Sequence, residues 1–449
     1  MTTLLHHTNS PEKDIVKMKR SNTKKTLLMA CMLGFGAACN NARGEHTVHD
    51  VDGVTGPNFT LTAKSGYVST AEGNSVYFWG FANGTGPAQY PGPTMIVIQG
   101  QLVKVTVKNE LPVPVSIVFP GQQGIRSQGG IQGTIARQAA PGATVQYSFI
   151  ARQPGTYMYE SGSQPDLQTE MGLVGALIVR PTDYNPVNNR KAYAHSDSSY
   201  EHEFLYVLSE MDENIHDQVE EQVKTGKPIQ VDMTKRWPVY WFINGRTGPD
   251  TVLPANAPWL PHQPYDALTM IHAGDVTLMR VVGAGRDSHP FHHHGNHAKV
   301  IARDGRYLST AGQTGGTVGA DLAYHVFTIP SSPGSTYDAL FSWTGEKLGW
   351  DVYGHAPEDP LAPHEYAEDH GKPFPVKLPQ DQDLTFGQMY SGSPFLGSLG
   401  NLPPGEGGFN PVGGFMYMWH SHAEKELCNN NIFGGGMMTF LLIAAHPAH

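Results

Sequence analysis

Short runs of β-branched and aromatic residues alternate with clusters of Gly, Pro, Asn and Asp from Asn58 onward. This spacing is typical of a β-sandwich or barrel and not of helices. In the first half of the chain, the clearest predicted strands cover residues 94–98, 102–107, 115–119, 144–150 and 175–179. A second series covers residues 204–209, 239–245, 268–271, 276–282, 298–302, 324–329, 339–343, 415–422 and 437–443. The chain is therefore predicted to be all-β.

A polar, proline-bearing stretch at residues 181–200 separates the two series, and we expect a domain boundary there. The predicted N-terminal domain covers residues 57–182, and the predicted C-terminal domain covers residues 200–449. Within the second domain, residues 345–414 have little strand signal and are rich in Pro, Gly and acidic residues. So long an insertion is more often a lid or an interface than free coil.

The N-terminal segment 1–39 has the pattern of a signal peptide, because the basic stretch KRSNTKK precedes the apolar run TLLMACMLGFGAA. This run is too short to span a bilayer. It ends at Cys39 in GAAC, which is similar to a bacterial lipoprotein signal, so the mature chain would be either acylated or released. We expect an exported protein that is periplasmic, outer-membrane-associated or extracellular.

Charge and cysteine content narrow the function further. The formal net charge of −10 argues against nucleic-acid binding. Two of the three cysteines, Cys31 and Cys39, belong to the export segment, which leaves Cys428 as the lone cysteine of the predicted domains. Such a residue is a small buried hydrophobe, a reactive thiol or a metal ligand.

The stretch HPFHHHGNH at residues 289–297 contains five histidines. On a strand, His292 and His294 leave the same face, while His293 leaves the other. The pair His420 and His422 in WHSH has the same spacing. One such pair alone is more often incidental surface histidine, but two pairs on adjacent strands would bring four imidazoles together. Imidazole suits copper, zinc, iron and nickel, so the residues predict a metal site without naming the metal.

Several longer segments together resemble the multicopper oxidase family over about Asn58 to Ile443. They are YPGPTMIVIQGQLVKVTVKNEL, PGTYMYESGSQPDLQTEMGLVGALIV, VYWFINGR, SHPFHHHG and MWHSHAEKELCNNNIFGGGMMTF. The resemblance implies two cupredoxin-like Greek-key β-sandwich domains and copper as cofactor. It matches His292 to a type 2 copper ligand, and His294, His420 and His422 to type 3 ligands.

The same resemblance implies that other copper ligands of the family are missing. Four residues occupy the positions where the family has N-terminal histidine ligands. Val118, Pro120 and Gly162 have side chains that cannot bind a metal, and Glu160 has a carboxylate in place of an imidazole. At the type 1 position, His289 is retained, while Ser421 and Glu426 replace a cysteine and a histidine. A blue copper centre needs a thiolate, which only Cys428 could supply. We therefore expect a reduced copper site, with Glu160 as a candidate carboxylate ligand.

Three functions fit this pattern. The first is a copper-dependent oxidoreductase with a small-molecule or metal-ion substrate, the second an envelope copper-binding or copper-resistance protein without turnover, and the third a metal-free cupredoxin scaffold. Membrane attachment would run through Cys39. A homotrimer would let a neighbouring subunit supply missing ligands from His262, His272, His297, His355, His364 or His370.

Overall fold

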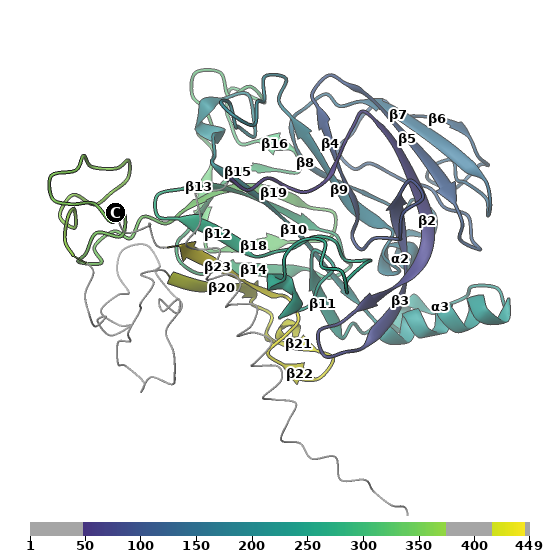
Figure 1. Ribbon diagram of the computed structural model, residues 1–449. Helices are drawn as coiled ribbons and strands as arrows, with labels where there is room; N and C mark the ends of the chain where they lie inside the picture. Colours follow the sequence, from purple (N-terminus) through teal and green to yellow (C-terminus); the bar gives the residue numbers. More distant parts are fainter. Residues whose placement is uncertain (1–47, 374–414, 445–449) are drawn as a thin grey trace, which may run out of the picture. The chain divides into compact units, whose positions relative to one another are not determined.

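The computed structural model describes residues 48–373 and 415–444, so the predicted signal peptide and residues 374–414 of the predicted insertion lie outside the described residues. Strands dominate the described part (Figure 1). This confirms the all-β prediction.

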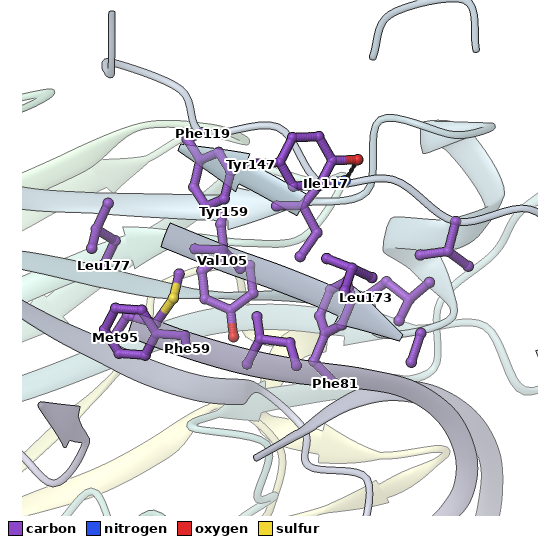
Figure 2. Close-up of a cluster of buried hydrophobic side chains, with 14 of the residues drawn as sticks. Phe59, Phe81, Met95, Val105, Ile117, Phe119, Tyr147, Tyr159, Leu173 and Leu177 are labelled. Atoms are coloured by element: carbon purple, nitrogen blue, oxygen red, sulfur yellow. Dashed lines mark hydrogen bonds between the residues drawn. The ribbon is translucent and has the colours of Figure 1, made fainter. Parts of the chain in front are cut away.

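Residues 54–180 form two sheets. The first contains, in spatial order, β1 (Val54–Thr55), β4 (Gly92–Ile98), β9 (Val174–Arg180) and β8 (Gly155–Glu160). The second contains β3 (Ser75–Asn83), β2 (Asn58–Ser69), β5 (Leu102–Asn109), β7 (Thr144–Ile150) and β6 (Arg126–Gly129). Alternating side chains of these strands fill a common core, as expected for a sandwich. Figure 2 shows part of this core, where the backbone N–H of Ile117 donates to the Tyr147 hydroxyl.

The described residues between 202 and 444 form one sheet of seven strands, one of five and a short ribbon. The seven-stranded sheet contains β11 (Tyr240–Ile243), β10 (His202–Met211), β13 (Val276–Gly283), β19 (Thr336–Ser342), β15 (Ala298–Arg303) and β16 (Arg306–Tyr307), with β17 (Tyr324–Val326) paired to β15. The five-stranded sheet contains β12 (Thr269–His272), β23 (Met438–Ala444), β20 (Phe415–Ser421), β14 (His289–His293) and β18 (Thr328–Ser331). The ribbon joins β21 (Cys428–Asn429) to β22 (Ile432–Phe433).

Two predicted strands differ in the structure. Residues 115–119 make only isolated bridges at Val115 and Val118, so this stretch is not a regular strand. Residues 324–329 are divided at Phe327 between β17 and β18, which pair with different sheets. A local apolar pattern does not record which sheet a strand joins, and for this reason it did not show the division.

The helices are few among the described residues. They are α2 (Pro165–Glu170), α3 (Glu213–Thr225) and the 3₁₀ turns η1 (Ser196–Ser198), η2 (Met233–Lys235), η3 (Asp250–Val252) and η5 (Glu424–Leu427). The strand pattern did not predict α3, although Asp212 caps its N-terminus and Gly226, at φ 67°, its C-terminus. None of the described helices combines the length and apolar character that crossing a membrane requires.

The sheets of the two halves pack through a shared apolar cluster, in which Phe78 and Tyr90 from the first half meet Phe242 and Val282 from the second. We propose that the two halves are the two predicted domains, with the bounds given above.

A buried network of charges also joins the two halves. From the first half, Arg180 donates to Glu203 at 2.6 Å, while Thr156 accepts from Arg280 at 2.8 Å. Arg280 in turn contacts Glu203 at 2.6 Å and Asp338 at 3.2 Å. Burial alone would raise the pKa of Glu203, but the two guanidinium groups hold it well below its usual range. Two positive and two negative groups thus balance one another away from water.

Replacing Glu203 by Gln is expected to lower the free energy of unfolding by about 3–5 kcal/mol, because it leaves buried guanidinium charge uncompensated. Glu110→Gln is the matched control. Its carboxylate is 59% exposed and 3.4 Å from Lys64, so its loss should cost under about 1 kcal/mol. Chemical denaturation of both variants measures the difference, and equal costs would contradict the role given to the network.

Candidate metal centre

The two histidine pairs lie on neighbouring antiparallel strands. In the register of β14 and β20, His292 stands opposite His420 and His293 opposite Trp419. His294 and His422 directly follow their strands, and the His294 N–H lies 3.4 Å from the Met418 carbonyl oxygen. The predicted meeting of the two motifs is confirmed.

Three of the imidazoles form one compact group of donors. Donor atoms of His292, His294 and His420 all lie within 4.8 Å of one another. The Nε2 atoms of His294 and His420 are 3.3 Å apart. The fourth ring, that of His422, has its centroid 4.8 Å from that of His292, but its side chain is 52% exposed and lies 3.4 Å from Glu424. His422 therefore lies at the open edge of a three-histidine group.

Hydrogen bonds on the far side of two rings fix their orientation. Nδ1 of His420 lies 2.8 Å from the Ser421 carbonyl oxygen, which can only accept, so Nδ1 carries the proton and Nε2 keeps its lone pair. Nδ1 of His292 lies 2.8 Å from the hydroxyl of Thr328 on β18. Such outer contacts are what orients histidine as a metal ligand.

The surroundings keep these rings neutral. Burial, reinforced by the neighbouring imidazoles, lowers the pKa of His292 to about 4 and that of His294 to about 4. Burial also lowers the pKa of His420. Neutral imidazole is the form that binds a metal, so the group is ready to do so at neutral pH without losing protons.

His293 points to the opposite face, as the strand periodicity predicts. It is fully buried against Phe341 and Trp419, with ring centroids 6.0 and 5.9 Å away. Its role is in the core between the sheets.

The corresponding segments of the N-terminal half also lie side by side. Val118 and Glu160 exchange backbone hydrogen bonds of 2.9 and 3.2 Å. Gly162 has no room for a side chain, because a Cβ there would lie 2.7 Å from Val118 Cγ1. The Glu160 carboxylate accepts from Arg286 at 2.9 Å and is not in the three-histidine group.

A polar network of uncharged side chains occupies the same region. Ser163 contacts Ser116 at 2.9 Å and Gln138 at 2.7 Å, and Ser161 donates to Gln168 at 2.6 Å. Hydroxyl and amide groups therefore satisfy one another here, which the sequence motifs did not indicate.

Comparison with known proteins identifies the chain's relatives. The family model for multicopper oxidases matches residues 62–183. Multicopper oxidase MCE of Talaromyces pinophilus is 35% identical over 109 residues, which are 24% of this chain and 17% of that protein. Copper resistance protein A of Escherichia coli is 31% identical over 127 residues, 28% of this chain and 19% of that protein. The matched segments span less than a fifth of these two relatives.

The fold agrees over a greater length. The blue copper oxidase of Nitrosomonas europaea superposes with a TM-score of 0.52 at 19% identity, covering 86% of this chain and 85% of that one. The multicopper oxidase mgLAC gives a TM-score of 0.51 with the same coverage and identity. These comparisons show similarity to multicopper oxidases in sequence over residues 62–183, and in fold over most of the chain. The fold of the chain is that of the cupredoxins, as predicted.

Copper is the cofactor of multicopper oxidases, and the three-histidine group fits it. Two nitrogens bound to one metal at about 2.0–2.1 Å with a tetrahedral angle are about 3.3–3.4 Å apart, by the bond lengths of imidazole to first-row metals. The 3.3 Å between His294 and His420 matches this value. Imidazole is also among the ligands that copper prefers.

The predicted type 1 position does not fit a blue copper ion. Both nitrogens of His289 are taken, Nδ1 by Glu426 at 2.8 Å and Nε2 by Glu210 at 2.7 Å, and all three side chains are buried. The hydroxyl of Ser421 accepts from the backbone N–H of Ala423 at 3.2 Å. Cys428 is half-buried against the apolar core and is not in the histidine group.

An imidazolium with two carboxylates thus occupies the position that the resemblance matches to a type 1 copper site. Burial alone would lower the pKa of His289, but Glu210 and Glu426 raise it to about 9. Arg236 bonds Glu210 and Glu170 and lies 3.2 Å from Asp287, which adds a second cation. The sequence indicated the loss of a ligand at Glu426, but not this ion pair, because Glu210 is far away in the chain.

The His289 ion pairs predict a pH-dependent stability. A pKa raised from about 6.5 to about 9 stabilises the fold fully below about pH 6.5, and this contribution, on the order of 3 kcal/mol, is lost as pH rises through 9. In Glu426→Gln the folded-state pKa falls, so the decline should start at lower pH and be smaller. Denaturation of metal-free protein across this range is the measurement.

The matched control is Glu424→Gln, on the same turn, where the side chain is 73% exposed. It should leave the pH profile of the wild type unchanged. A profile for Glu426→Gln identical to that of the control would show that His289 is not held protonated.

Proposed function

We propose that this chain belongs to the multicopper oxidase family and is an exported copper-dependent oxidoreductase with a reduced copper site. The observation that carries the proposal is the group formed by His292, His294 and His420, whose donor atoms lie within 4.8 Å of one another. His422 at its edge is a fourth donor. Bound copper would supply one-electron chemistry between Cu(II) and Cu(I).

The altered residues around the group define what the substrate must do. The thiolate position holds Ser421, and both nitrogens of His289 are bonded to carboxylates. No type 1 centre is therefore expected to pass electrons to the histidine group. A small-molecule or metal-ion substrate would have to reach the histidine group directly. It would do so from the side of His422, whose side chain is exposed.

A copper-binding or copper-resistance protein without turnover is the second candidate. The match to copper resistance protein A favours it, since the same histidines serve both functions. The metal-free scaffold is the third. Export through residues 1–39, attachment through Cys39 and trimer formation belong to the same proposal and rest on the sequence pattern.

Joint replacement of His294 and His420 by Ala should remove about one copper per chain, since it takes two of three imidazoles from the group. Bound copper is measured after dialysis, with electron paramagnetic resonance to detect the nitrogen ligands. His325→Ala, an exposed histidine on β17, is the matched control and should keep the copper of the wild type.

The same samples separate the three functions. Copper-dependent oxygen consumption with a phenol or a reduced metal ion, lost in the double variant only, supports the oxidoreductase. Copper bound without any turnover supports the binding protein. Equal copper in the double variant and in the wild type would refute the site.

The copper-loaded protein should be pale. Intense blue colour arises from sulfur-to-copper charge transfer, and the site is built from imidazoles. Cys428→Ser should leave the visible spectrum unchanged, because Cys428 lies outside the histidine group. An intense red absorption band that disappears in Cys428→Ser would instead make this thiol a ligand.

A further inference from the structure

Residues 343–373 follow β19 and contain no helix or strand. Four apolar side chains nevertheless pack the start of this segment into the core of the second half: Trp343, Leu348, Trp350 and Tyr353. Trp350 stacks on Phe415, the first residue of β20, with ring centroids 6.2 Å apart. Because this segment lacks the regular backbone hydrogen bonds of a helix or strand, its conformation must be stabilised by other contacts.

Four metal-ligating side chains converge within it. One donor atom each from Asp351, His355, Glu365 and His370 lies within 4.8 Å of all the others. The two carboxylates are almost fully buried, with exposed fractions of 1% and 3%, and the two histidines are 20% and 14% exposed. They come from both ends of the segment, so the group closes a loop.

The group is held in place by the backbone. Asp351 accepts from the N–H groups of Tyr353 and Gly371, each at 2.8 Å, and Glu365 accepts from that of Ala362 at 2.8 Å. These contacts orient the carboxylates from outside, as the outer contacts of metal ligands do.

The two imidazoles face the carboxylates through Nδ1. Nδ1 of His370 lies 2.8 Å from Glu365 Oε1. Nδ1 of His355 is buried, and it lies 3.1 Å from Glu365 Oε2 and 3.5 Å from Asp351 Oδ2. Neither contact has the alignment of a hydrogen bond, so this nitrogen has no hydrogen-bond partner among the described residues. It is a buried donor atom directed into the group.

We propose that Asp351, His355, Glu365 and His370 bind a divalent transition-metal ion, with zinc as the best match. Four ligands at about 2.0–2.2 Å in a tetrahedron are about 3.3–3.6 Å apart. The four distances from the His355 and His370 nitrogens to the carboxylate oxygens are 2.8, 3.1, 3.5 and 3.8 Å, which bracket this range. Two imidazoles with two carboxylates are a zinc ligand set, whereas calcium and magnesium take oxygen ligands.

The expected role of this ion is structural. Asp351 and His370 are brought together across the segment, and Cys428 as the lone cysteine of the predicted domains allows no disulfide to do so. The group is anchored beside Phe415, whereas His420 lies five residues further along β20, about 16 Å at the rise of a strand. The ion would therefore order the segment without taking part in copper chemistry. This inference does not depend on the proposed function.

The test uses the full chain and zinc alone. His355→Gln with His370→Gln should lose about one equivalent of bound zinc and the rise in melting temperature that zinc gives the wild type. The matched control is His364→Gln, an exposed histidine of the same segment, which should keep both. Cobalt(II) in place of zinc should give tetrahedral absorption bands that the paired variant lacks.

A second variant separates this site from the copper site. The His294→Ala, His420→Ala variant should still bind zinc in the segment, so the zinc proposal can be tested even if the copper proposal is wrong. Should the paired glutamine variant not fold, Asp351→Asn is measured instead. The proposal would be overturned if the folded variant kept all of its zinc, or if the His294→Ala, His420→Ala protein bound none. The four side chains would then form only ion pairs between histidine and carboxylate.

Discussion

The antiparallel register of β14 and β20 is the constraint on which the candidate site depends. It places His292 opposite His420, and the alternation of side chains along each strand then brings His294 to the same face. A slip of one residue would exchange His292 for His293 and direct the imidazoles into the apolar core. The register is secured from that core, because Trp419 packs there against His293. Core packing and metal binding thus require the same alignment.

The contacts of His289 show how a position that resembles a copper site can be filled without a metal and without an unpaired buried charge. His289, Glu210 and Glu426 are all buried, and a buried imidazole with no partner or a buried carboxylate with no counter-charge would be costly. Together they neutralise one another, with Arg236 as a further cation. Ser421, at the position that the resemblance matches to a thiolate, is therefore compatible with a stable fold.

Much of the candidate site could be predicted because it depends on residues that are close together in the sequence. Period-two spacing placed His292 and His294 on one face and His293 on the other. Contacts between segments that are far apart in the sequence could not be predicted from such spacing. The partnership of Glu210 with His289 depends on which strands become neighbours in space. The residues that cap α3, Asp212 and Gly226, are typical of helix ends, but the strand pattern alone did not predict this helix.

The two proposed metal sites differ in a way that bears on which metal each would hold. Copper binds most nitrogen and oxygen sites more tightly than zinc does, so affinity alone would place copper in both. Geometry and availability must then decide. In the segment that follows β19, backbone N–H groups hold two carboxylates beside two imidazoles, a ligand set that zinc binds as a tetrahedron, whereas Cu(II) prefers a tetragonal geometry. The imidazole-only group at His292 and His420 lies at a strand end with His422 as an exposed donor, so its ligands could adjust if bound copper changed oxidation state.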